Sequence, residues 1–228
     1  MIFLEELFSV FFPETCLCCS QPISKNSHSI CLSCRHELPF TNYTDHKANK
    51  VEKSFYGRIP LEAATALLHF QKKGPVQTLM HQLKYRGQQK IGTLLGIWMA
   101  ESLRNSERFK TIDCIVPVPL HKKRLKKRGY NQLTKFGETM AKTLDIPYMA
   151  DNLIRIKSTA TQTRKFRMER WSNVTTKFYI KKPHVFENKH ILLVDDIITT
   201  GATVEACFNA FQHVNQFKMS LATMSYTK

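Results

Sequence analysis

The chain has 228 residues, 43% of them hydrophobic, which is enough for one α/β domain with a small appendage and too apolar for wholesale disorder. Lysine and arginine (34) outnumber aspartate and glutamate (18), and the formal net charge of +16 indicates an anionic partner: nucleic acid, a phosphorylated metabolite or an acidic membrane surface. No apolar run approaches the roughly 18 residues of a membrane span.

The first segment, MIFLEELFSVFFP, is apolar but carries Glu5 and Glu6 where a secretory signal carries lysine or arginine. We interpret it as an amphipathic helix that packs on the body of the protein, with peripheral membrane contact as the alternative. The chain is therefore expected to be cytoplasmic, with the inner face of the cell membrane as an alternative location. In the cytoplasm, seven cysteines indicate a metal site or reduced thiols rather than disulfides.

The first segment belongs to a short region of about residues 1–50 that is rich in cysteine and lacks long helical periodicity. Two CxxC pairs, Cys16/Cys19 and Cys31/Cys34, have the spacing of two zinc knuckles, each of which chelates one edge of a tetrahedral ion. Four thiolates close the coordination shell, so we predict a structural Zn²⁺ site without an open catalytic position. Cys18 is an alternative ligand with poorer spacing. A redox pair or unpaired thiols is the other interpretation.

From residue 51 to residue 228, strand-like and helix-like patterns alternate, which is typical of a doubly wound α/β domain with a parallel sheet flanked by helices. Strands are expected at 62–70 (EAATALLHF), 111–119 (TIDCIVPVP), 190–196 (HILLVDD) and 218–226 (KMSLATMSY). Apolar stripes predict helices over 74–87, from Ile91 to Met99, from Leu133 to Leu144 and from Val204 to Phe211. Cys114 and Cys207 fall in apolar patterns and are expected in the core.

A strongly basic stretch, HKKRLKKRGYNQ, follows the strand at 111–119. It should lie near the carboxyl edge of the sheet and meet a pyrophosphate or a DNA backbone; its cations are Lys122, Lys123, Arg124, Lys126, Lys127 and Arg128. Tyr130 is a candidate for base stacking. A second basic segment contains Arg164, Lys165, Arg167 and Arg170, followed by Trp171 as another stacking candidate. The alternative for both segments is a solvated face without a ligand.

The stretch ILLVDDIITTGAT combines a buried strand, two carboxylates and a loop that opens a helix. Free N–H groups and the positive end of the helix dipole bind phosphate, and Gly201 permits close backbone approach. Hydroxyl groups of Thr199, Thr200 and Thr203 add donors, while Asp195 and Asp196 can accept from sugar hydroxyls. The sequence therefore predicts a site for a phosphorylated sugar. A threonine-capped helix with solvated aspartates is the alternative.

This stretch resembles the phosphoribosyl pyrophosphate (PRPP) motif of type I phosphoribosyltransferases. The resemblance implies that Asp195 and Asp196 bind the ribose hydroxyls and that Mg²⁺ bridges ribose and pyrophosphate. It also implies that the 5′-phosphate is held by Thr199, Thr200, Gly201, Ala202 and Thr203.

The order of motifs is similar to that of the ComF/ComFC family, which joins this fold to an N-terminal four-cysteine zinc module. Further matches are LKYRG (residues 83–87), VPVPLHKKRLKKRGYNQ (116–132) and TATQTRKFRMERWSNV (159–174). The RGYNQ match adds weight to Arg128 and Asn131 as ligand candidates. The KYRG match adds weight to Lys84 and Arg86, for which a cap on the preceding helix is the alternative. The resemblance implies a role in natural competence, with single-stranded DNA as a partner and contact with helicase or channel proteins of DNA uptake.

Three functions remain open at this point. The first is a competence protein that binds PRPP or nucleotide and assists uptake or processing of single-stranded DNA. The second is an active nucleobase phosphoribosyltransferase, for which neither a base-recognising hood nor a general acid or base is identifiable. The third is a non-catalytic, zinc-bearing protein that binds single-stranded DNA. The catalytic residues are therefore unknown.

Overall fold

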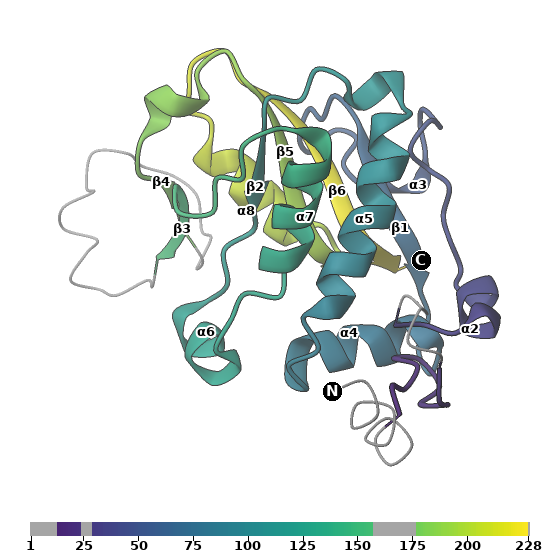
Figure 1. The fold of residues 1–228 in the computed structure, drawn as a ribbon. Helices are drawn as coiled ribbons and strands as arrows, with labels where there is room; N and C mark the ends of the chain where they lie inside the picture. Colours follow the sequence, from purple (N-terminus) through teal and green to yellow (C-terminus); the bar gives the residue numbers. More distant parts are fainter. Residues whose placement is uncertain (1–12, 24–28, 157–176, 228) are drawn as a thin grey trace.

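The computed structural model describes residues 13–23, 29–156 and 177–227 (Figure 1). The expected N-terminal helix and the second basic segment, with Trp171, lie outside these residues. Within the described ranges, no helix combines the length and apolar character needed to cross a membrane.

The core of the fold is a four-stranded sheet with the order β1–β6–β5–β2, in which all neighbouring strands are parallel. Its strands are β1 (Ala64–Phe70), β2 (Cys114–Pro117), β5 (His190–Ile198) and β6 (Lys218–Thr227). Ile191 to Val194 are fully buried, as expected for a strand covered on both faces. The predicted α/β fold with a parallel sheet is confirmed. A separate antiparallel ribbon pairs β3 (Leu153–Ile156) with β4 (Lys177–Ile180).

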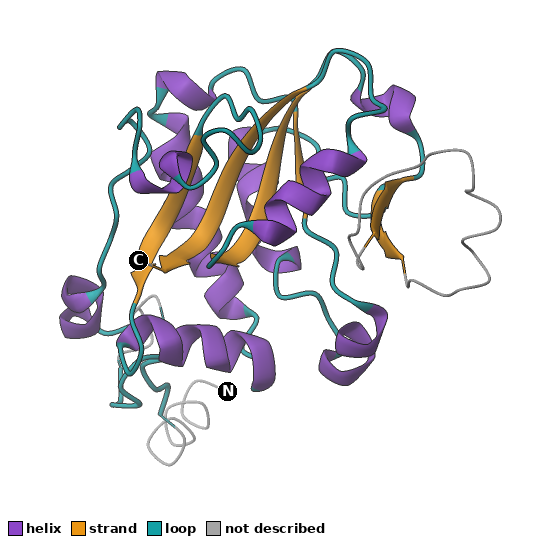
Figure 2. Cartoon of the chain, turned by 180° about the vertical axis from the view of Figure 1, so that it is seen from behind, coloured by secondary structure: helices purple, strands orange, loops and turns teal. Residues whose placement is uncertain are grey.

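Helices cover both faces of this sheet. On one face α5 (Lys90–Arg104) packs against α7 (Thr134–Leu144), and the close approach requires Gly96, since a Cβ there would lie 2.8 Å from the Phe136 carbonyl oxygen (Figure 1). The opposite face, seen in Figure 2, carries α8 (Ala202–Ala210) and the short α3 (Lys50–Lys53). Short 3-10 turns at Glu107–Phe109 and Pro183–Phe186 complete the connections.

The carboxyl ends of the strands, at the lower edge in Figure 1, gather three further elements. They are the cysteine-rich module with α2 (Leu32–Glu37), α4 (Pro75–Tyr85) and the basic helix α6 (Lys122–Arg128). Ligands of open α/β sheets bind at this edge. The described part of the chain thus brings the cysteine pairs, LKYRG, the basic stretch and the acidic pair with its loop to one end of the sheet.

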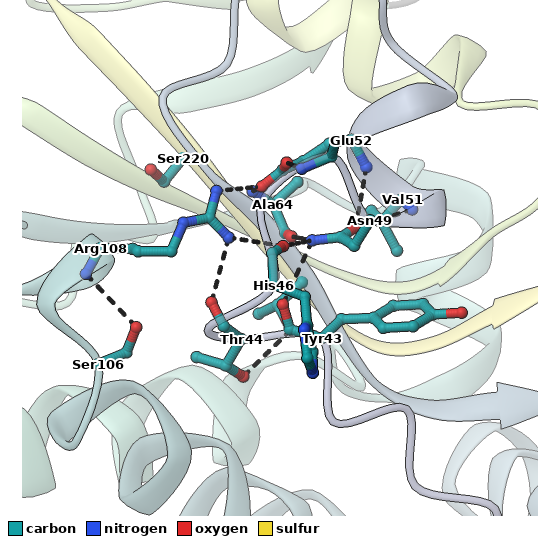
Figure 3. Close-up of polar contacts among 12 residues, drawn as sticks. Tyr43, Thr44, His46, Asn49, Val51, Glu52, Ala64, Ser106, Arg108 and Ser220 are labelled. Carbon is teal, nitrogen blue, oxygen red and sulfur yellow. Dashed lines mark hydrogen bonds and ion pairs between the residues drawn. The ribbon is translucent and has the colours of Figure 1, made fainter.

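The segment that follows the cysteine-rich module packs on the outer strand β1. The Thr41 N–H donates to the Leu67 carbonyl (3.0 Å), and the His69 N–H donates to the Pro39 carbonyl (2.8 Å). Farther on, the Asn49 side chain caps α3 and donates to the Ala64 carbonyl (2.8 Å) (Figure 3). Buried Glu52 forms an ion pair with Arg108 in the same network. The segment thus runs along β1 from the carboxyl half of the strand, beside the module, to its amino end at Ala64.

Candidate functional site

The two adjacent aspartates lie within strand β5, not after it. The sequence predicts a strand over residues 190–196, but Ile197 and Ile198 continue the pairing with β6, opposite Ser225 and Tyr226. Since side chains alternate along a strand, Asp195 and Asp196 point to opposite faces of the sheet. Both are nearly buried, with relative exposures of 9% and 7%.

Asp196 faces the side of α4 and α7, where two side chains bind it. Its Oδ2 atom lies 2.9 Å from Lys84 Nζ and accepts a 2.6 Å hydrogen bond from Gln132 Nε2. A buried carboxylate needs a counter-ion and hydrogen bonds, and these two partners supply both. Lys84, which the sequence indicates as an anion ligand, is therefore paired with the acidic motif.

Asp195 faces the side of α8, where its charge interacts with Cys207 and with Arg155 of β3. Burial, and after it the negative charge of Asp196, raise the pKa of Asp195 to about 8. The Asp196 N–H donates to Asp195 Oδ1 (2.8 Å), and this bond only partly offsets the effect. At neutral pH Asp195 consequently retains its proton in much of the population.

The RGYNQ segment folds onto the LKYRG segment and forms one network with Asp196. The Tyr130 hydroxyl donates to the Leu83 carbonyl, and the Arg128 guanidinium lies over the Tyr85 ring, 5.1 Å from its centroid. Arg128 Nη1 donates to Gln132 Oε1 (2.6 Å), and Gln132 donates in turn to Asp196. The network joins two motifs to the acidic pair through side chains.

Two predicted ligand residues of this segment make contacts within the protein. The Asn131 side chain donates to the Val118 carbonyl (3.4 Å) and accepts from the Leu133 N–H (3.1 Å). The ring of Tyr130 is half-buried against the core. These contacts hold the turn between α6 and α7. A role of Tyr130 in base stacking and of Asn131 in ligand binding stays a prediction.

The basic stretch forms α6, a helix with no buried residue. His121 accepts from the Lys123 N–H at its start (3.2 Å), and Gly129, with φ of 78°, ends it in the left-handed conformation. Its five outer cations, Lys122, Lys123, Arg124, Lys126 and Lys127, are exposed to solvent. They form a concentrated positive surface near the carboxyl edge.

The loop after β5 has the features of an anion site. Thr199, Thr200, Ala202 and Thr203 are exposed, and the N-cap residue of α8, Gly201, offers no side-chain cap. The Ala202 N–H donates to the Thr200 hydroxyl (3.4 Å), a long bond that an anion can replace. Gly201 has a φ of 75°, and a Cβ there would lie 2.7 Å from the Phe55 ring. Arg58 Nη1 donates to the Thr200 carbonyl (2.8 Å), which braces the loop from the turn after α3.

The four cysteines predicted as metal ligands form one cluster. The sulfur atoms of Cys16, Cys19, Cys31 and Cys34 all lie within 4.8 Å of one another. Burial opposes ionisation of Cys16, but N–H donors of Cys19, Cys31 and Cys18 outweigh it and lower its pKa to about 6. Cys18 differs, because burial raises its pKa to about 12. Thiolate is the metal-binding form, so this geometry can hold a metal such as zinc.

The cysteine module contacts the site through α4. Gln82 Nε2 donates to the Leu17 carbonyl between the first two ligands (2.7 Å), and Leu17 is buried. Lys84 lies two residues beyond Gln82 on the same helix. The module therefore helps to position the helix that carries the counter-ion of Asp196.

Two cavities lie elsewhere. One of about 620 Å³ lies between α2 and α5 beside Trp98, and one of about 610 Å³ lies beside Arg108 and His190. Neither is lined by the acidic pair or by the loop that follows it. The candidate site is therefore defined by the acidic pair and the loop that follows it, and not by either of these cavities.

Sequence reasoning missed four residues of this region. Gln132 and Tyr85 stood in matched motifs, but nothing in their spacing showed that they contact Asp196 or Arg128. Arg58 and Arg155 carried no sequence signal, since they stand outside every motif and approach the site only through the fold.

The fold and site define a class: an α/β protein with a parallel sheet, an acidic pair followed by a threonine-rich loop and a helix, and a four-cysteine cluster. No protein-family model matches the chain. Among solved structures, a purine phosphoribosyltransferase from Pyrococcus horikoshii aligns with a TM-score of 0.38 and 16% identity over 60% of this chain and 83% of that chain. An adenine phosphoribosyltransferase from Thermoanaerobacter pseudethanolicus aligns with a TM-score of 0.38 and 11% identity over 76% and 98%.

Sequence relatives are more specific. Competence protein F of Haemophilus influenzae is 25% identical over 85% of this chain and 89% of its own length. The DNA utilization protein YhgH of Escherichia coli K12 is 31% identical over 57% of this chain and 58% of its own length. Competence protein ComFC of Bacillus subtilis is 36% identical over 40% and 34%. The chain is a homologue of proteins named competence protein F, ComFC and YhgH.

Proposed function

We propose that this protein takes part in DNA uptake or utilization, binds PRPP or a nucleotide through its β5–α8 loop, and binds single-stranded DNA through α6. The names of its relatives support the process. The observation that carries the ligand is the gathering of the Thr199–Thr203 loop, the acidic pair and Lys84 at the carboxyl edge of one sheet.

Each part of the site has a role in this proposal. The start of α8 and the threonine hydroxyls receive the 5′-phosphate, and Gly201 forms the left-handed turn that packs this loop against Phe55. Asp195 and Asp196 accept from ribose hydroxyls, and Mg²⁺ accompanies the pyrophosphate. In the unliganded chain Lys84 and Gln132 satisfy Asp196. They are then available to rearrange toward the ligand.

The remaining surfaces fit an anionic polymer and a structural ion. The five outer cations of α6 are exposed and have no acidic neighbour on that helix, so they are available for backbone phosphates. The four-cysteine cluster would hold Zn²⁺, whose binding stabilises a module too small for a core of its own. We place the protein in the cytoplasm, beside helicase or channel proteins of the uptake machinery at the membrane.

Calorimetric titration with PRPP and Mg²⁺ tests the ligand. The wild-type protein is expected to bind with micromolar affinity, and Asp195→Asn/Asp196→Asn is expected to lose at least tenfold because neutral amides bind Mg²⁺ and hydroxyl donors more weakly. Exposed Asp151→Asn is the matched control and should bind as the wild type does. Absence of binding to folded, zinc-loaded wild-type protein would contradict the proposal.

A further inference from the structure

Arg155 is the second-to-last residue of β3, and one of the hydrogen-bond donors of its side chain has no acceptor among the described residues. It is opposite Phe178 in the β3–β4 ribbon, and its guanidinium carbon lies 5.5 Å from the centre of that ring. Its Nε atom is buried, yet it has no hydrogen-bond partner among the residues that the structure describes. Buried donors are nearly always paired, so an orphaned guanidinium nitrogen beside a candidate site points to a missing acceptor.

The charges around Arg155 point the same way. After burial, the largest influence on its pKa is the positive charge of Arg124 on α6; both lower it, and the opposing effects of Cys207 and Asp195 are smaller. In both Figure 1 and Figure 2, the β3–β4 ribbon and α6 lie beyond the same edge of the sheet, the one formed by β2.

We propose that Arg155 and Arg124 form a clamp for a doubly charged phosphate group on the α8 side of the acidic pair. The clamp rests on the proposed function in one respect, since that function supplies the phosphorylated ligand. Arg155 would donate from the buried Nε and an Nη atom to two phosphate oxygens, and Arg124 would close over the group from α6. Two arginines that repel each other are then held together by the anion between them.

The chemistry favours a phosphate monoester or a pyrophosphate over other anions. A guanidinium binds carboxylate or phosphate in the same forked geometry, so shape alone does not choose. The net charge of the anion does distinguish them, because a phosphate monoester carries about −1.5 to −2 at pH 7, whereas a carboxylate or a backbone phosphodiester carries only −1. The two cations Arg155 and Arg124 match this higher charge.

The test is calorimetric titration of the full-length, zinc-loaded protein with inorganic pyrophosphate, without Mg²⁺. Arg155→Gln is expected to bind pyrophosphate about 10-fold to 100-fold more weakly than the wild type, the effect of losing charge-assisted hydrogen bonds. Lys181→Gln removes one charge from an exposed residue just after β4 and should leave the affinity nearly unchanged. Arg155→Lys keeps the charge without the fork and should still lose several-fold.

The outcomes separate the clamp from its alternatives. Pyrophosphate affinity that is unchanged in Arg155→Gln, or absent in the wild type, overturns the clamp. If Arg155 serves only as the counter-ion of Asp195, Arg155→Gln/Asp195→Asn regains both thermal stability and affinity, which also overturns it. Should Arg155→Gln fail to fold, Arg155→Lys decides, because wild-type affinity in that variant contradicts a forked contact.

A titration with Mg²⁺–PRPP distinguishes the two proposals. Pyrophosphate binding that depends on Arg155, together with no binding of Mg²⁺–PRPP, supports the clamp and contradicts the proposed ligand. Binding of Mg²⁺–PRPP that is indifferent to Arg155 supports the ligand and overturns the clamp.

Discussion

Replacing Lys84 by Met tests whether the network around Asp196 stabilises the unliganded protein. The ion pair is mostly buried, with side-chain exposures of 18% for Lys84 and 9% for Asp196, and its atoms lie 2.9 Å apart. Methionine keeps the length of the side chain and removes the charge. Asp196 would retain the hydrogen bond from Gln132 but lose its adjacent cation.

The expected cost follows from that geometry. Removing one partner of a fully buried pair costs about 3–5 kcal/mol, and the partial exposure of Lys84 and the remaining hydrogen bond reduce this to about 2–4 kcal/mol. For a chain of this size, each kcal/mol lowers Tm by about 2–4 °C, so a fall of roughly 5–15 °C is expected. Urea unfolding and differential scanning calorimetry at neutral pH measure both quantities.

Two further variants make the prediction sharp. Lys135→Met removes an exposed pair with Glu138, whose side chains are 49% and 45% exposed, and should cost less than about 0.5 kcal/mol. Lys84→Met/Asp196→Asn should recover more than about 1 kcal/mol of the loss, because the uncompensated charge is gone. The reasoning is refuted if Lys84→Met is as stable as Lys135→Met, or if the double variant shows no recovery.

Three other predictions concern zinc, DNA and pH. Cys16→Ser or Cys31→Ser should lower zinc below one equivalent by atomic emission and unfold the cysteine module, whereas Cys18→Ser should keep it; equal zinc in all three contradicts the ligand assignment. Replacing the four lysines of α6 by alanine should reduce the slope of log K against log salt for single-stranded DNA by up to about 3, and an unaltered slope would make that helix a solvated face. The pKa of Asp195 is raised from 3.8 to about 8, so its contribution to stability is full below about pH 4 and is lost as the pH rises through 8. In urea titrations between about pH 4 and pH 8, the unfolding free energy of Asp195→Asn should therefore fall less with pH than that of the wild type. Equal pH dependence of the two proteins would contradict the raised pKa.

Much of the fold and part of the site could be predicted from local patterns. Apolar runs and helical stripes identify β1, β5, β6 and the flanking helices, because burial imposes a period on each element by itself. The spacing of the cysteine pairs likewise predicts their cluster, since each knuckle is a local chelate. The Thr199–Thr203 loop was recognisable because a strand, a turn and a helix start are contiguous in the chain.

The length of β5 could not be predicted from the local sequence pattern. The acidic pair looked like the end of a strand, yet Ile197 and Ile198 extend it because β6 continues alongside and offers backbone partners. Pairing with a distant strand outweighed the local signal of two carboxylates. The consequence is functional, as residues within a strand alternate and send Asp195 and Asp196 to different faces.

By itself, then, the sequence determined which residues have the chemistry of an anion and metal-binding protein and which elements carry them. Only the tertiary structure decided their partners. Gln132 and Asp196 are 64 residues apart in the chain, and Arg58 and Thr200 are 142 apart. Such contacts leave no periodic trace, because they arise from the strand order β1–β6–β5–β2, which no local pattern encodes. Arg155 became visible only when the fold buried its Nε beside the acidic pair without an acceptor.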